Sequence, residues 1–232
     1  MNEEDRNYQI KQLKQDTKLL KSIGINGLYI QKAQRDKILN LLNDKKSQDS
    51  FKNLDEIRIA VERCERCPLH KERKNTVFSR GSAMSDVMFI GEGPGKDEDE
   101  AGLPFVGRAG QLLNKILEAM KLPIDNVYIC NIVKCRPPQN RKPTFDEIDS
   151  CSHYLMGQIS FVKPKVIICL GATAAEGILG TKERIKDLRG KFFDKYNAKI
   201  IVTYHPAALL RDPSRKKLVW EDMQLVMREI GQ

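Results

Sequence analysis

Four short apolar runs, separated by segments of helical pattern, constrain the fold of this chain more than any other feature. The runs are residues 87–90, 127–133, 166–170 and 200–204. Short continuous apolar strands that alternate with helices are typical of a parallel sheet covered on both faces. Helices are expected between them at 110–120, 144–161 and 172–179. The sequence therefore predicts an α/β fold with three layers, α/β/α, around a four-stranded parallel sheet.

The N-terminal part of the chain has a different composition. Residues 1–50 are rich in Lys, Gln, Asn and Asp, and their apolar positions have a loosely helical spacing that breaks near 24–27. Ten Lys and Arg against seven Asp and Glu make this segment only mildly basic. We expect a helical N-terminal extension over 1–53 and one folded domain over 54–232. A plain linker and an arm that contacts a partner or DNA both fit the extension.

Charge favours nucleic acid as a partner, and hydropathy argues against a membrane span. Forty Lys and Arg against 31 Asp and Glu give a formal net charge of +9. This charge favours polyanions, although a basic surface can also serve solubility alone. No apolar run approaches the roughly 18 residues that a membrane span needs. The acidic start lacks the pattern of a signal peptide, so we expect a cytoplasmic protein.

Glycines and hydrogen-bonding side chains follow the apolar runs. In open α/β sheets, ligands bind beyond the carboxyl ends of the strands, where such residues meet. Glycine allows a tight turn and a close approach of the backbone, while Glu, Asn and His supply acid–base and hydrogen-bonding groups. Residues 91–95 match neither a P-loop nor a dinucleotide fingerprint. Each residue alone could be structural, but their shared edge indicates a site. The candidates are Gly91, Glu92, Gly93, Asn131 and His205.

The six cysteines fall into two groups. Cys130 and Cys169 lie inside apolar runs and are expected to be buried apolar side chains. The others, a C-x2-C pair and two separate thiols, are Cys64, Cys67, Cys135 and Cys151. Four thiolates can bind zinc or an iron–sulfur cluster, and spacing alone does not distinguish these. Cysteines without a metal are the alternative. The long separation between the pair and the other thiols argues against a self-contained zinc finger.

With these residues in view, the chain resembles the family 4 uracil-DNA glycosylases, the iron–sulfur branch of that superfamily. The resemblance covers about residues 57–231, and its motifs lie at 64–67, 91–95, 102–110, 131–138 and 205–207. It implies a DNA repair enzyme that hydrolyses the N-glycosidic bond of uracil in DNA, releases free uracil and leaves an abasic site. It also implies a 4Fe-4S cluster on Cys64, Cys67, Cys135 and Cys151.

The resemblance implies a role for each motif residue. Asn131 can donate to O4 of uracil and accept from N3–H, a pattern that cytosine does not match. Phe105 resembles the ring that stacks on the flipped base, and His205 resembles the donor to O2 of the leaving base. Glu92 resembles the acidic residue near C1′. Glu98 resembles the residue that excludes the methyl group of thymine.

A basic segment around His205 is expected to contact DNA. Residues 182–217 contain eleven Lys and Arg against four Asp and Glu, a charge that supports salt-dependent binding to phosphates. Arg211 and Arg215 are the candidate contacts. Leu209 resembles the wedge that fills the space left by a flipped base, although it could instead pack inward. A related branch that traps DNA covalently carries an Arg-rich insertion near this motif, which this chain lacks.

Two other interpretations remain. A relaxed-specificity glycosylase of the same superfamily would act on other deaminated bases, and Asn131 and Glu92 disfavour it. A non-catalytic iron–sulfur module could bind DNA or sense redox state, but it would not need Glu92, Asn131 and His205 at one edge of a sheet. We expect a monomer that acts on uracil-containing DNA. The sequence indicates neither a strand preference nor a replication-factor partner.

Overall fold

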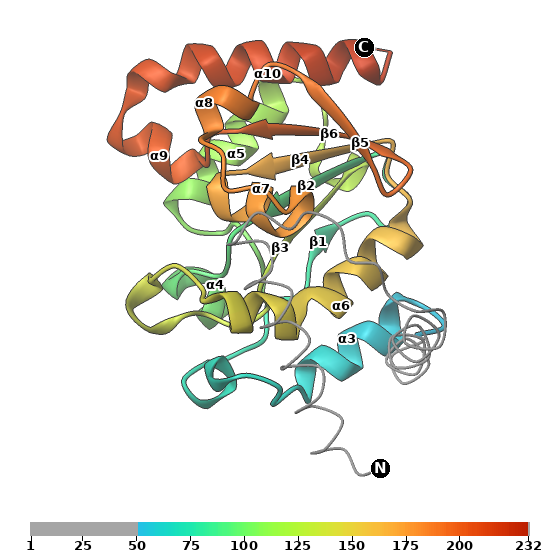
Figure 1. The fold of residues 1–232 in the computed structure, drawn as a ribbon, viewed down its shortest axis with the longest axis vertical. Helices are drawn as coiled ribbons and strands as arrows, with labels where there is room; N and C mark the ends of the chain where they lie inside the picture. Colours follow the sequence, from blue (N-terminus) through green and yellow to red (C-terminus); the bar gives the residue numbers. More distant parts are fainter. Residues whose placement is uncertain (1–50, 232) are drawn as a thin grey trace, which may run out of the picture. The chain divides into compact units, whose positions relative to one another are not determined.

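The computed structural model describes residues 51–231 (Figure 1). These residues belong to one compact unit, which begins at Phe51. The predicted extension over 1–53 therefore lies outside the described residues except for 51–53, and its helical character stays a prediction. None of the described helices is long and apolar enough to cross a membrane.

A six-stranded sheet lies at the centre of this unit, in the order β1-β3-β2-β4-β6-β5 (Figure 1). The strands are β1 (Arg80–Gly81), β2 (Val87–Gly91), β3 (Val127–Asn131), β4 (Val166–Leu170), β5 (Phe192–Lys195) and β6 (Ala198–Thr203). The inner four strands are parallel, which confirms the predicted centre. The predicted number of strands, four, is too low, because β1 and β5 add to the sheet as antiparallel edge strands. Neither forms an apolar run, because β1 has two residues and β5 ends on exposed charges.

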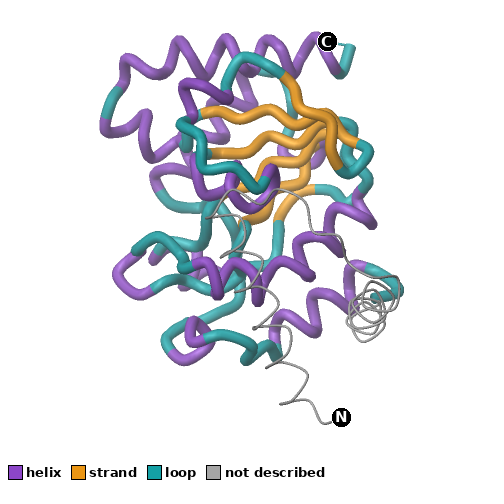
Figure 2. Tube along the Cα trace, viewed as in Figure 1, coloured by secondary structure: helices purple, strands orange, loops and turns teal. Residues whose placement is uncertain are grey.

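Helices cover both faces of the sheet and give the predicted three layers (Figure 2). Successive strand residues point to opposite faces. Met88 and Ile90 therefore pack in one hydrophobic cluster, and Val87 and Phe89 pack in the other. A continuous, closely packed apolar core lies on each face of the sheet. Close packing on both faces holds the ends of the strands in place, so residues at their edge have fixed positions.

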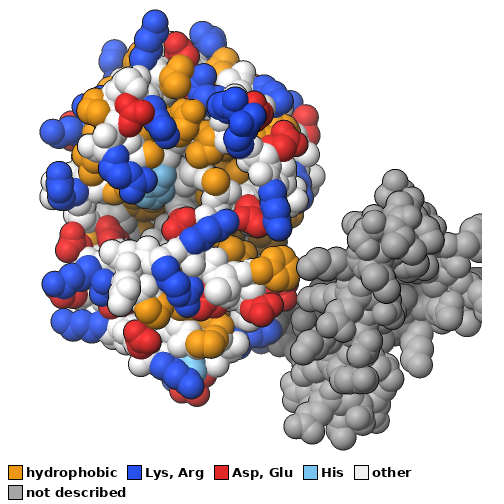
Figure 3. Space-filling view, turned by 60° about the vertical axis from the view of Figure 1, so that its left-hand side comes forward, with side chains coloured by type: hydrophobic (Ala, Val, Ile, Leu, Met, Phe, Trp, Pro, Cys, Tyr) orange, Lys and Arg blue, Asp and Glu red, His pale blue; other side chains and the backbone are white. Residues whose placement is uncertain are grey.

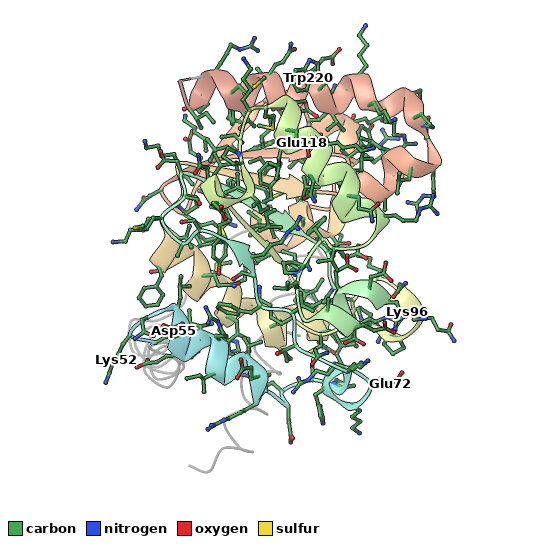
Figure 4. All side chains as sticks on the ribbon, turned by 180° about the vertical axis from the view of Figure 1, so that it is seen from behind. Lys52, Asp55, Glu72, Lys96, Glu118 and Trp220 are labelled. Carbon is green, nitrogen blue, oxygen red and sulfur yellow. The ribbon has the colours of Figure 1, made fainter. Side chains whose placement is uncertain are left out.

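The helices divide between the two layers according to their buried residues. The first cluster receives residues from α3 (Leu54–Glu62), α6 (Phe145–Val162), α7 (Ala172–Leu179) and α8 (Ile185–Leu188). The second receives residues from α5 (Arg108–Ala119), α9 (Pro206–Arg211) and α10 (Lys216–Glu229). Figure 4 shows this second layer from behind, with Glu118 on α5 and Trp220 on α10. The helices predicted at 110–120, 144–161 and 172–179 correspond to α5, α6 and α7.

Short connections place helix starts beside the strand ends. Helix α7 begins directly after β4 and Gly171, and α9 begins at Pro206 shortly after β6. Between β2 and α5, the short helix α4 (Lys96–Ala101) lies in a longer connection. These starts bring backbone N–H groups and their capping side chains to the carboxyl edge of the sheet.

Candidate active site

A cleft of about 340 Å³ opens beyond the carboxyl ends of the parallel strands. Its volume suits one small ligand, since protein ligand sites span about 300–1,000 Å³. The predicted residues that line it are Glu92, Gly93, Glu98, Phe105, Asn131 and His205. Residues from separate parts of the chain thus meet where the strand pattern predicted a site.

Asn131, the last residue of β3, carries an unsatisfied hydrogen-bond acceptor into this region. Its side chain is 2% exposed, and its Oδ1 atom is buried with no partner among the described residues. Buried polar atoms almost always have partners, so such an atom indicates a ligand that donates a hydrogen. Gly91 leaves room for the amide, because a Cβ there would lie 2.4 Å from Oδ1.

Phe105 forms an aromatic wall next to the histidine of the cleft. Its ring centroid lies 5.5 Å from that of His205, and the residue is 5% exposed. The backbone at Phe105 has φ of +57°, a left-handed conformation that bulky residues rarely adopt. Glycines surround it closely: a Cβ at Gly91 would meet its ring at 2.6 Å, and one at Gly110 would meet its carbonyl oxygen. The surrounding fold therefore fixes the ring in an otherwise costly position.

His205 precedes α9 and serves as its N-cap. The Ala207 backbone N–H donates to Nδ1 of the imidazole at 3.1 Å. Because Nδ1 accepts, the proton of the neutral ring resides on Nε2. Burial lowers the pKa of His205 to about 4, and the positive charge of Arg211 acts in the same direction. At neutral pH the residue is thus an uncharged hydrogen-bond donor through Nε2.

Glu92, in the segment after β2, is oriented by a threonine that the sequence analysis did not assign. The Thr173 hydroxyl, in the first turn of α7, donates a short hydrogen bond to Oε2 of Glu92. Thr173 is 3% exposed, so its hydroxyl reaches Glu92 from the buried side of the cleft wall. The signal in the sequence was the position of Thr173 two residues after Gly171, at the end of the third apolar run.

Glu98 lines the cleft but directs its carboxylate to the backbone. Its Oε1 accepts from the N–H groups of Val106 and Gly107 at 3.0 and 2.9 Å, and its Oε2 accepts from Gly95 at 3.1 Å. The side chain therefore ties the start of α4 to the loop that carries Phe105. Sequence reasoning missed this bracing role, because it depends on contacts with a loop eight or nine residues later.

The structure favours the inward-packing alternative for Leu209 over the wedge role. Leu209 is 2% exposed and packs in the hydrophobic core between the sheet and α10, so it cannot enter DNA without unpacking that core. The exposed leucine of α9 is its neighbour Leu210, at 42%. Helical geometry explains the difference, since adjacent residues of a helix face different sides and only one faces the sheet.

The predicted phosphate contacts lie on the surface near α9. Arg211 is exposed. Arg215 is held by Asp212, with 2.8 Å between Nε and Oδ2, and its guanidinium lies 4.9 Å from the Tyr204 ring centroid. In Figure 3, many Lys and Arg side chains lie around a hollow on one face of the described part, with some Asp and Glu side chains at its rim. Such a face attracts a polyanion.

The four predicted cysteine ligands line a second pocket, together with Arg73 and Tyr154. Arg73 donates through Nη1 to the sulfur of Cys135 at 3.2 Å and to the Cys64 carbonyl at 2.7 Å. Burial raises the pKa of the Cys67 and Cys135 thiols, and that of Cys151 to about 12. In residues 51–231, no three ligand-type side chains are arranged to hold a single metal ion. The remaining cysteines, Cys130 and Cys169, are fully buried in β3 and β4, as predicted.

A mixed α/β sheet with an amide, an imidazole and a carboxylate at one edge forms a cleft that can bind one small ligand and exchange hydrogen bonds with it. Residues 78–224 match the family model described as "Uracil DNA glycosylase superfamily". The Type-4 uracil-DNA glycosylase of Thermotoga maritima is 45% identical over 71% of this chain and 88% of its own length. That of Saccharolobus solfataricus is 45% identical over 77% and 87%, and that of Pyrobaculum aerophilum 41% over 75% and 92%. The chain therefore belongs to the uracil-DNA glycosylase superfamily, in its type-4 group, which confirms the resemblance found from the motifs.

Proposed function

We propose that this protein hydrolyses the N-glycosidic bond of uracil in DNA and leaves an abasic site, the first step of base excision repair. The type-4 relatives support the substrate, since they are named uracil-DNA glycosylases. The observation that carries the proposal is the buried, unpartnered Oδ1 of Asn131 in the cleft. Uracil in its usual tautomer offers an N3–H donor between two carbonyl acceptors, which is the complement of an amide side chain.

Asn131 would distinguish uracil from cytosine. Its Oδ1 would accept from N3–H and its amide nitrogen would donate to O4. Cytosine has an unprotonated N3 and an amino group at C4, so both contacts would become unfavourable. Leaving buried groups unpaired in this way gives strong discrimination. Phe105 would stack on the face of the base, a contact worth about 1–3 kcal/mol. Gly91 and Gly93 would leave room for the base.

His205 and Glu92 would act on opposite ends of the breaking bond. As the C1′–N1 bond breaks, its electron pair moves to uracil and builds negative charge at O2. The Nε2–H of neutral His205 would donate to that oxygen, and a preorganised donor of this kind commonly contributes about 100-fold or more. The Glu92 carboxylate, oriented by Thr173, would stabilise the cationic sugar and accept a proton from the water that attacks C1′.

Binding of DNA would depend on the basic surface around the cleft. Arg211 and Arg215 would contact phosphates, and the exposed Leu210 would take the wedge role originally expected of Leu209. We expect a monomer that acts in the cytoplasm on single- or double-stranded DNA. Residues 1–53 would be an extension outside the catalytic domain at 54–232.

The cysteine pocket would hold a 4Fe-4S cluster. Its lining includes the four thiols of Cys64, Cys67, Cys135 and Cys151. Four cysteine thiolates are the ligand set of such a cluster, in which each thiolate binds its own iron. Once bound, the cluster would supply structural cross-linking between the 64–67 segment, Cys135 after β3 and Cys151 on α6.

The proposal is tested with oligonucleotides that carry a single U, incubated with the purified protein and then cleaved in alkali. Matched strands with hypoxanthine, thymine or cytosine serve as controls. Cleavage of the U strands alone is expected. Cleavage of the hypoxanthine strand at a similar rate would favour the relaxed-specificity enzyme. DNA binding without cleavage of any strand would favour the non-catalytic module.

A further inference from the structure

A buried lysine connects the cysteine pocket to the base-reading residue. Lys134 is 1% exposed, and its Nζ donates to the backbone carbonyl of Asn131 at 2.7 Å and to Oε1 of Gln158 at 2.5 Å. Gln158, on α6, is fully buried and donates in turn to the Tyr128 hydroxyl at 2.9 Å and the Phe78 carbonyl at 3.2 Å. This hydrogen-bond chain holds the end of β3 against α6.

The charge of Lys134 has no carboxylate partner among residues 51–231. A buried ammonium with only neutral acceptors is costly, so a nearby negative group is expected. The cysteine pocket lies next to it: Cys135 is the following residue, and Lys134 lines the pocket together with Cys151. Metal-binding cysteines are thiolates, which would supply the missing negative charge.

The main chain of Lys134 is fixed on both sides as well. Its carbonyl accepts from the Val77 N–H at 2.8 Å. Lys134 therefore bonds the strand end that carries Asn131, Gln158 on α6, and the segment before β1, and it lies beside Cys151 in the cysteine pocket. Outer groups of this kind orient binding residues without touching the ligand.

We propose that Lys134 is a positioning residue that holds Asn131 in its base-reading geometry and joins it to the cysteine pocket, so that base recognition and cluster retention depend on the same buried side chain. The inference deepens the proposed function and rests on it. Lys134 touches neither the base nor the reacting atoms. Replacing Lys134 should therefore weaken the recognition of uracil more than the affinity for DNA.

The test is Lys134→Met, which keeps the length of the side chain and removes its charge and donors. Lys165→Met is the matched control, because the Lys165 side chain, just before β4, is 70% exposed and forms its ion pair with Asp86, just before β2. Three quantities are measured for each holoprotein: the inhibition constant of free uracil, the affinity for abasic product DNA at fixed salt, and the rate of iron loss to a chelator.

For Lys134→Met we expect uracil to bind about tenfold more weakly, because a displaced Asn131 would lose about one hydrogen bond to the base. Affinity for abasic DNA should stay within about twofold, as phosphate contacts lie elsewhere, and iron should be lost faster. Lys165→Met should match the wild type. Unchanged uracil inhibition, an equal loss of affinity for abasic DNA, or unchanged iron retention would each overturn the inference.

A second variant keeps the test decisive if Lys134→Met does not fold. Gln158→Met removes one acceptor of the Lys134 ammonium and leaves the lysine in place. It should weaken uracil inhibition by a smaller factor, while wild-type inhibition would overturn the inference. A wild-type protein that neither excises nor is inhibited by uracil would instead refute the proposed function, so the two failures are distinguishable.

Discussion

Replacement of His205 separates its two roles, as a donor in the cleft and as the cap of α9. His205→Ala removes the Nε2–H donor, and the rate of uracil excision should fall by about 100-fold or more, equal to about 2.7 kcal/mol of transition-state stabilisation. It also leaves the Ala207 N–H without its acceptor, and losing an N-cap costs about 0.5–2 kcal/mol of stability. His205→Asn is the matched variant, because Asn is a favoured N-cap that cannot place a donor where Nε2 lies.

Both variants should be slow, but only His205→Ala should be clearly less stable. Single-turnover rates on a U-containing strand, DNA affinities at fixed salt and thermal melts distinguish these effects. The pH profile gives an independent check, because the pKa of His205 is lowered to about 4. The wild-type rate should not fall as the pH is lowered through about 6.5, the ordinary pKa of histidine. The donor role of His205 would be refuted if His205→Ala excised uracil at the wild-type rate. It would also be refuted if the wild-type pH profile showed a fall near pH 6.5 that is absent in His205→Asn.

Four further outcomes are expected. Asn131→Asp should weaken uracil excision and admit slow excision of cytosine, because a protonated carboxyl can pair with cytosine; rates on U and C strands check this. Cys135→Ala should lose iron and melt at lower temperature with little effect on the chemistry of any folded fraction, as metal content and calorimetry would reveal. Thr173→Val should slow excision about tenfold at unchanged DNA affinity, since Glu92 loses its orienting donor. The pKa of His205 is about 4 in the folded protein and about 6.5 in the unfolded chain. The unfolded chain therefore binds a proton first as the pH falls. The free energy of unfolding should be highest above pH 6.5 and decrease by up to about 3 kcal/mol as the pH falls towards 4, which urea titrations would measure.

The sequence predicted the inner sheet because apolar runs buried on both faces leave an unmistakable pattern. The same pattern located Asn131 and His205, since strand ends in a parallel sheet meet at one edge. It could not reveal β5, whose exposed Asp194 and Lys195 pair with β6 through backbone hydrogen bonds that no side-chain pattern reports.

The direction in which individual side chains point could not be predicted from the sequence either. Leu209 and Leu210 are identical residues in adjacent positions, and only the docking of α9 on the sheet decides that the first is buried. Likewise, Glu98 and Lys134 look like surface charges in the sequence. Their bracing roles arise from partners up to 24 residues away that folding brings into contact.

Direct quantification of free uracil tests the central claim most simply. The wild-type protein and Asn131→Ala are incubated with a strand that carries one U, and the released base is measured by chromatography alongside abasic sites. The wild type should release one uracil for each abasic site formed, and Asn131→Ala should release far less while retaining affinity for abasic DNA. Equal release by both proteins, or binding of the strand with no release by the wild type, would contradict the assignment of this cleft as a uracil-excising site.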